Sequence, residues 1–172
     1  MVLLFGILTG QIEKAQQYFK HVAANYQRIK EQEKLANQNP LLISGYIYGD
    51  QWVAPAGQSF EATFYKDAGF CYYFDREPGT GSCFSSIAKV LTKSTEVVYW
   101  LNPAKPSRAA LLQEFPKYRH FPFFNKRVFC YTHQTNKYWE QAAAHPDWIL
   151  YDLRQILTTK PKKLHFYKEL TP

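Results

Sequence analysis

Cationic and aromatic side chains are interleaved over residues 104–137, a pattern that can bind polyanions. Seven lysines and arginines stand there against one acid, Glu114, so this segment carries +6 of the formal net charge of +7. Cations bind phosphates and exposed rings stack on unpaired bases, which suits single-stranded nucleic acid or an anionic membrane surface. The expected binding residues are Lys117, Tyr118, Arg119, Phe121, Lys126 and Arg127. The alternative, which we favour, is a core of aromatic side chains with a solvated cationic rim, because no known nucleic-acid-binding motif accompanies the segment.

Three cysteines could carry redox or metal chemistry. Cys71 and Cys83 flank a Pro-Gly loop and are expected on adjacent strands, so a disulfide between them is feasible in an oxidising compartment. In a reducing compartment all three cysteines would be buried free thiols. Cys130 and His133 could join Cys83 and His120 around zinc, but residues 130 and 133 of one strand point to opposite faces. We therefore predict no metal site.

The catalytic patterns that we sought are missing from the sequence. The Gly-Ser-Cys stretch at 81–83 does not fit a nucleophile elbow, and Asp75 and Glu77 next to a Pro-Gly pair are typical of a charged loop tip. A phosphate-binding loop and a dinucleotide fingerprint are also missing. We predict no catalytic residues and no cofactor. A small hydrolase that uses Cys83, or the two acids, is the enzymatic alternative.

Residues 1–40 are expected to form a long N-terminal helix that positions whatever follows. Apolar residues recur at helical spacing between 12 and 29, and the Asn-rich stretch ending at Pro40 terminates the pattern. The apolar start at 1–8 is shorter than the ~20 residues that cross a bilayer core. Because it runs without a break into the helix, it fits the end of a membrane anchor. The alternative is a buried first element of an ordinary soluble domain.

Residues 41–112 are expected to form an antiparallel β-module. Alternating or β-branched runs at 41–48, 59–65, 70–74, 82–90 and 96–101 are separated by short turns, which indicates a small sheet or partial barrel. Ser107 is expected to cap a helix over 108–115. Residues 113–172 are then a basic, mixed α/β tail packed on the same core, with a strand at 127–132 and an amphipathic helix at 147–157.

These elements define an α+β fold with a long N-terminal helix, a central antiparallel β-sheet or partial barrel, and a helical C-terminal tail. The chain of 172 residues is long enough for one well-cored domain. Its 17% aromatic content excludes a disordered chain, and 8 Gly with 10 Pro exclude a collagen-like one.

The stretch VVYWLNPAKPSRAAL at 97–111 resembles the closing motif of a bacterial membrane-protein family known only as a domain of unknown function. That motif has the form V-x-V-Y-Y-x-P-x-x-P-x-x-A-x-L. Residues 43–49 are similar to the opening strand of the family, and residues 60–74 would be its central hairpin. The resemblance covers residues 41–112 and implies a small β-domain attached to transmembrane helices, with no catalytic residues to transfer.

Together, these features predict a non-enzymatic binding protein of the bacterial cell envelope, anchored to the membrane. Its expected partner is a protein or an anionic membrane surface. The alternative is a cytoplasmic nucleic-acid-binding protein that uses the 104–137 segment, and the second alternative is the small hydrolase.

Overall fold

The chain is an α+β protein that begins with helix, as predicted. The computed structural model describes residues 2–32, 39–131, 137–158 and 161–170. The helices are α1 (Val2–Leu8), α2 (Ile12–Glu31), α3 (Phe60–Ala68), α4 (Ile87–Lys93), α5 (Arg108–Glu114), η1 (Pro116–His120), α6 (Tyr138–Gln141) and α7 (Pro146–Ile156). The strands are β1 (Leu41–Ser44), β2 (Tyr46–Tyr48), β3 (Gln51–Pro55), β4 (Cys71–Tyr72), β5 (Ser82–Ser86), β6 (Tyr99–Leu101), β7 (Arg127–Cys130) and β8 (Lys168–Glu169).

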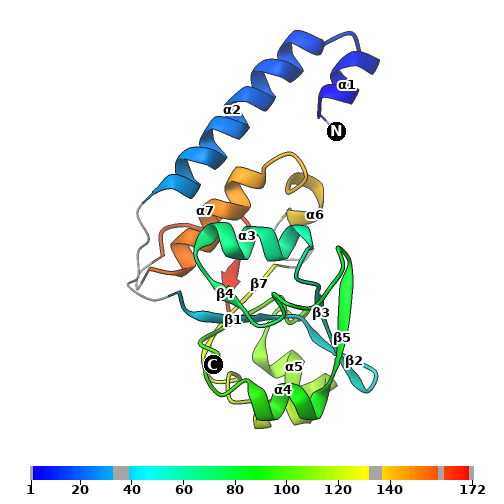
Figure 1. Cartoon of the computed structure of the whole chain (residues 1–172), viewed down its shortest axis with the longest axis vertical. Helices are drawn as coiled ribbons and strands as arrows, with labels where there is room; N and C mark the ends of the chain where they lie inside the picture. The colour runs from blue at the N-terminus through cyan, green and yellow to red at the C-terminus, as the bar shows by residue number, and fades with distance from the viewer. Residues whose placement is uncertain (1, 33–38, 132–136, 159–160, 171–172) are drawn as a thin grey trace.

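The N-terminal segment forms two helices instead of one continuous helix. The break falls at Gly10, whose φ of +67° is a conformation that glycine adopts without strain. Helix α1 folds back along the start of α2 (Figure 1), and a Cβ on Gly6 would lie 2.4 Å from the Cβ of Ala15. The expectation of an uninterrupted run is therefore wrong. Among the described residues, no helix combines the length and apolar character needed to cross a membrane.

Two sheets make up the β-structure. The larger one has the strand order β4-β1-β6-β7-β8, in which β4, β1, β6 and β7 are parallel and β8 is antiparallel. The smaller sheet, β2-β3-β5, is antiparallel. The expected antiparallel pairing thus holds for the small sheet and is wrong for the central one. Strands from 41–112 and from 113–172 lie side by side in the central sheet.

Residues 60–74 hold the main departure from the predicted strands. They form α3 followed by β4, so the hairpin implied by the family resemblance is wrong. Ser59 caps the helix through its Oγ, which accepts the N–H of Ala62 at 3.1 Å, and Gly69 ends it at a φ of +102°. Helix α3 then provides the crossover that a parallel connection from β1 to β4 requires.

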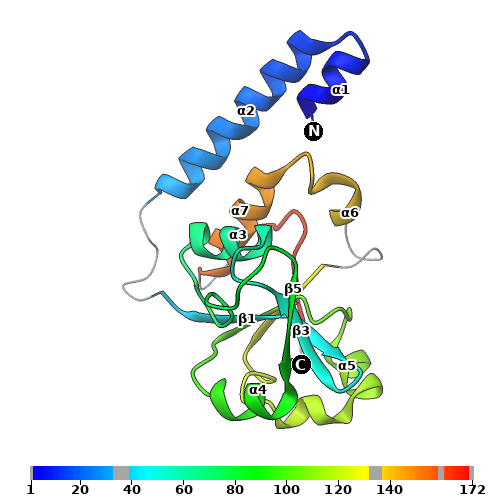
Figure 2. The ribbon, with the colours of Figure 1, turned by 45° about the vertical axis from the view of Figure 1, so that its right-hand side comes forward.

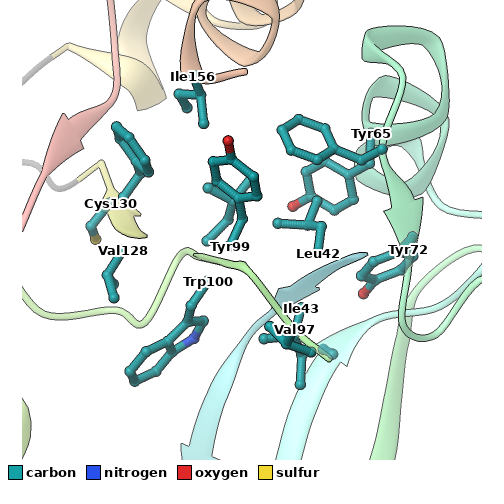
Figure 3. Close-up of a cluster of buried hydrophobic side chains, with 14 of the residues drawn as sticks. Leu42, Ile43, Tyr65, Tyr72, Val97, Tyr99, Trp100, Val128, Cys130 and Ile156 are labelled. Atoms are coloured by element: carbon teal, nitrogen blue, oxygen red, sulfur yellow. The ribbon is translucent and has the colours of Figure 1, made fainter. Parts of the chain in front are cut away.

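Helices cover both faces of the central sheet, which explains why β6 and most of β1 and β7 are buried. Figures 1 and 2 show α3 and α7 on one face, with α4 and α5 on the other side. Leu42 and Tyr99 are paired in register and face Tyr65 and Ile156 in the close-up of Figure 3. Ile43, Trp100 and Val128 pair across the same strands on the opposite face.

The second face is filled by an aromatic cluster that includes residues of the basic segment. Trp52, Trp100, Tyr118 and Phe123 have ring centroids 5.2–6.4 Å apart, and all four side chains are fully buried. The Tyr118 hydroxyl accepts the N–H of Ile47 at 2.7 Å, so its polar atom is satisfied inside the core. Tyr118 and Phe123 of the basic segment therefore belong to the core.

Candidate functional site

The parallel strands reverse their order at β1, and this reversal marks a place where ligands commonly bind. Across the sheet the parallel strands lie in the order β4, β1, β6, β7. Strand β1 comes first in the chain, yet it lies between the later strands β4 and β6. In open α/β sheets the crevice beside the carboxyl ends at such a point is the usual ligand site. Ser44 ends β1, Asn102 follows β6, and Tyr131 follows β7. All three residues come to one edge of the sheet.

A cavity of about 430 Å³ opens at this edge, and we call it the switch-point cavity. Its volume lies in the range of small-molecule sites. The lining residues that carry polar or aromatic groups include Ser44, Glu61, Thr80, Asn102, Tyr131 and Trp139. The cavity therefore combines residues from the central sheet, the start of α3, the loop before β5 and helix α6.

The floor of the cavity is held by hydrogen bonds around Tyr65. The buried Tyr65 hydroxyl donates to Ser44 Oγ at 3.1 Å and accepts from Asn102 Nδ2 at 3.3 Å. Burial raises the pKa of Tyr65 above its ordinary value, and the bonds from Ser44 and Asn102 oppose that shift. Tyr65 therefore remains a neutral hydroxyl, and it fixes the positions of Ser44 and Asn102.

Asn102 has the features of a residue held in place for binding. Its φ is +56°, in the left-handed region, and its backbone N–H donates to the carbonyl of Phe129 at 2.9 Å. Its Oδ1 is buried and accepts no hydrogen bond from the described residues. Such a buried acceptor costs about 1–3 kcal/mol, and strained backbone of this kind concentrates at functional sites. Asn102 lines the switch-point cavity, while its Oδ1 itself is enclosed by protein.

Aromatic rings form one wall of the cavity. Tyr131 and Tyr138 stack with centroids 3.5 Å apart and planes 9° apart, and Trp139 meets Tyr131 edge-on at 5.8 Å. Burial, followed by the neighbouring Tyr138, raises the pKa of Tyr131. Trp139 keeps 59% of its surface exposed. This wall offers flat apolar faces beside the polar floor.

Glu61 supplies the negative charge at the cavity. It lies in the first turn of α3, where the helix dipole favours a carboxylate. No ion pair joins it to a cation among the residues that the structure describes. Burial raises the pKa of Tyr65, Tyr131 and Tyr138, and the charge of Glu61 adds a smaller contribution in the same direction.

The residues predicted to bind polyanions do not form a mixed aromatic and cationic surface. Tyr118 and Phe121 are buried, so neither ring can stack on a base. Lys117, Arg119 and Lys126 are exposed. Arg127 is engaged by Glu169, with Nε 2.9 Å from Oε1, and by the carbonyl of Ile156. The prediction of exposed aromatic rings is wrong because the chain uses them as core, as the favoured alternative expected.

The cysteines are free thiols in this structure, and the predicted geometry of Cys71 and Cys83 is wrong. Cys71 lies on β4 of the central sheet and Cys83 on β5 of the small sheet, so their strands are not neighbours. Burial raises the pKa of the Cys83 thiol, and raises that of Cys130 to about 12. Both thiols are therefore poor nucleophiles at neutral pH.

The acids singled out from the sequence do not form a metal-binding cluster. Asp75 is exposed, and Glu77 forms an ion pair with Lys89 at 3.1 Å. Among the described ranges, no three His, Cys, Asp or Glu side chains come together as metal ligands. His133, the proposed fourth member of a zinc site, lies outside the described residues.

The residues at the switch-point cavity were not recognised from the sequence. Their common signal was a polar residue directly after an apolar strand: Ser44 ends an apolar run, and Asn102 follows the run at 97–101. That signal indicates a site only if the strands are parallel, because then their carboxyl ends meet at one edge. Glu61 and Trp139 gave no separate signal.

Three further cavities are larger. One, of about 490 Å³, has a mixed lining that includes Arg108, Arg127 and Glu169. The other two are almost entirely apolar. They have volumes of about 530 and 500 Å³ and share Phe60, Phe64 and Ala143 between α2, α3 and α6. Exposed apolar side chains of α1, including Leu4 and Phe5, extend the same apolar character. Without convergent polar groups, these grooves offer little to orient a small solute.

Comparison with known proteins gives a likeness of fold. No family model matches the chain, and no curated protein is similar in sequence. A possible iron-binding (periplasmic solute-binding) protein from Staphylococcus epidermidis has a TM-score of 0.68 at 13% identity, over 92% of this chain and 60% of that one. A TroA-like periplasmic binding protein, FepB, from Veillonella parvula has a TM-score of 0.66 at 13% identity, over 99% and 60%.

An ABC transporter substrate-binding protein from Listeria monocytogenes has a TM-score of 0.63 at 13% identity, over 91% of this chain and 61% of that one. The chain therefore has the fold found in these periplasmic solute-binding proteins. It spans about 60% of their length.

Proposed function

We propose that this chain binds a small solute in the switch-point cavity and works outside the cytoplasm, in the bacterial envelope. The observation that carries the proposal is the cavity of about 430 Å³ at the carboxyl ends of the parallel strands, lined by the polar side chains of Ser44, Glu61 and Asn102. The fold neighbours, all described as solute-binding or substrate-binding proteins, support the same role. The role is binding without chemical conversion.

The chain matches only part of the length of its structural neighbours, so it accounts for only part of a binding site of their kind. Periplasmic binding proteins close two domains around their ligands. Because the chain matches about 60% of the length of its neighbours, we assign it the part of such a site that the switch-point cavity provides. Membrane attachment and a protein partner in the envelope remain proposals alongside this one.

A screen of small solutes by thermal shift, followed by calorimetric titration of each hit, tests the proposal. Ser82 is exposed and lines the cavity, so Ser82→Trp should fill it without disturbing the core. We expect this variant to weaken binding at least tenfold, while Thr95→Trp, at an exposed position away from the cavity, leaves binding unchanged. Equal affinity in the wild type and Ser82→Trp would place the solute elsewhere, and a screen with no hit would contradict the role.

A further inference from the structure

Charge distinguishes the switch-point cavity from the rest of this basic protein. The chain carries a formal net charge of +7, yet no lysine, arginine or histidine is among the described residues that line the cavity. Glu61 is the one residue among them with a formal charge at neutral pH. An anionic solute would therefore meet the Glu61 carboxylate and, among the described lining residues, no cation.

Glu61 differs from the four acids that form ion pairs with lysine or arginine among the described residues, although several exposed acids, such as Asp75 and Glu96, also lack such a partner. Asp67, Glu77, Glu114 and Glu169 each have a lysine or arginine partner within 2.9–3.1 Å. Glu61 has no such partner in the part of the chain that the structure describes. Glu61 lies in the first turn of α3, where the positive end of the helix dipole favours a negative charge. The carboxylate therefore offsets the attraction that this helix end would have for an anion.

The aromatic wall suits a positive charge that is spread over an organic group. Tyr46, Tyr131 and Trp139 all line the cavity, and the faces of Tyr and Trp rings attract ammonium groups. A bare metal ion is a poor match, because the described residues hold no group of three His, Cys, Asp or Glu ligands. Ser44 and Asn102, which also line the cavity, add neutral polar side chains.

From these observations, and resting on the proposed function, we propose that the solute of the switch-point cavity is an organic cation, held by the Glu61 carboxylate and by cation–π contacts with the aromatic wall. Glu61 provides the charge selectivity. Trp139 at the exposed side of the cavity provides an apolar face and a fluorescent reporter of binding.

The test compares probes of equal shape and different charge. Choline is matched with its neutral carbon isostere, in which a tert-butyl group replaces the trimethylammonium group, and with tert-butylacetate as the anionic analogue. Tetramethylammonium, putrescine and arginine extend the cationic set. Affinities are measured by calorimetry and by tryptophan fluorescence. We expect at least one cation to bind, and the isosteres to bind at least tenfold more weakly.

Substitutions of Glu61 and Trp139 test whether these two residues cause the selectivity for cations. Glu61→Gln should weaken cation binding at least tenfold and leave the neutral isostere unaffected, whereas Glu96→Gln, at an exposed position, should change neither. Trp139→Leu should weaken cation binding and abolish the fluorescence change; because Trp139 is exposed, this variant should keep its melting temperature.

The outcomes separate this inference from the function on which it rests. If neutral or anionic solutes bind and are blocked by Ser82→Trp while no cation binds, the inference is wrong and the proposed function stands. Unchanged cation affinity in Glu61→Gln would also overturn the inference. If solutes of every charge class fail to bind, both proposals fail.

Discussion

A single hydroxyl, that of Tyr65, connects the core of the protein to the polar floor of the switch-point cavity. It donates to Ser44 and accepts from Asn102, so two residues from different strands depend on one buried group. Buried polar groups that lose their partner are costly, since they can bond neither to protein nor to water. The geometry of the site is therefore tied to the stability of the fold at this residue.

Tyr65→Phe should lower the free energy of unfolding by about 1–3 kcal/mol, because it leaves Ser44 Oγ and Asn102 Nδ2 without their partner. Urea denaturation followed by circular dichroism measures the effect. The matched control is Tyr73→Phe, whose hydroxyl makes only a long, exposed bond of 3.4 Å to the Lys89 carbonyl. That change should cost less than about 0.5 kcal/mol. Equal costs for the two variants would contradict the role given to Tyr65.

At the scale of single elements, the sequence was most informative where a periodic pattern was long. The amphipathic helices now seen as α2 and α7, and the Ser107 cap of α5, were predicted close to their observed positions. The alternation of Phe60, Ala62 and Phe64 favoured a strand, but the capping residues Ser59 and Gly69 fit a helix, and the helix prevails. In nine residues, alternation alone does not distinguish the two structures.

The pairing of the strands could not be predicted from the sequence, because it depends on contacts between residues that are distant in the chain. Leu42 pairs with Tyr99, and Trp100 with Val128, in parallel strands. The residues within each strand do not indicate whether the pairing is parallel or antiparallel. The candidate site depends on that direction. Asn102 could be identified as a strand exit from its neighbouring Pro103, but its place beside Ser44 follows only from the sheet order.

Gly45 joins the two sheets and should tolerate no side chain. Its φ is +104°, and a Cβ there would lie 2.0 Å from the Val53 carbonyl oxygen. Gly49 also has a positive φ, +62°, but a Cβ there would meet no atom within 4 Å. Gly45→Ala should therefore destabilise the protein by more than about 3 kcal/mol, and Gly49→Ala by about 1 kcal/mol. Urea denaturation of both variants separates backbone strain from steric clash; similar losses would show that the clash is relieved.

At the scale of the whole molecule, an unusual share of the core is phenolic. Six tyrosines have strongly raised pKa values, mainly because of burial: Tyr26, Tyr65, Tyr72, Tyr118, Tyr131 and Tyr167. Their neutral forms are compatible with the core, whereas their ionised forms are not. The folded state is therefore expected to be less stable under alkaline conditions than at neutral or acidic pH.

Stability should fall steeply above pH 10. A tyrosine whose pKa is raised on folding stabilises the native state fully below its unfolded pKa of about 10, and this contribution is lost as the pH rises toward the folded pKa. Each such tyrosine removes about 1.4 kcal/mol per pH unit in that window. Urea denaturation between pH 8 and 11, with phenolate absorbance recorded in parallel, measures the effect. Ionisation of these six tyrosines while the circular dichroism stays native would contradict it.

The strand order described above also determines at which stage of folding the switch-point cavity can form. Strand β1, at residues 41–44, lies between β4 and β6, while Tyr131 reaches the same edge only after β7 has been added. Pairing between strands so far apart in the chain is slow, because a long loop must close first. The cavity is therefore assembled late during synthesis and refolding. A solute that binds only the assembled cavity would slow unfolding without hastening folding.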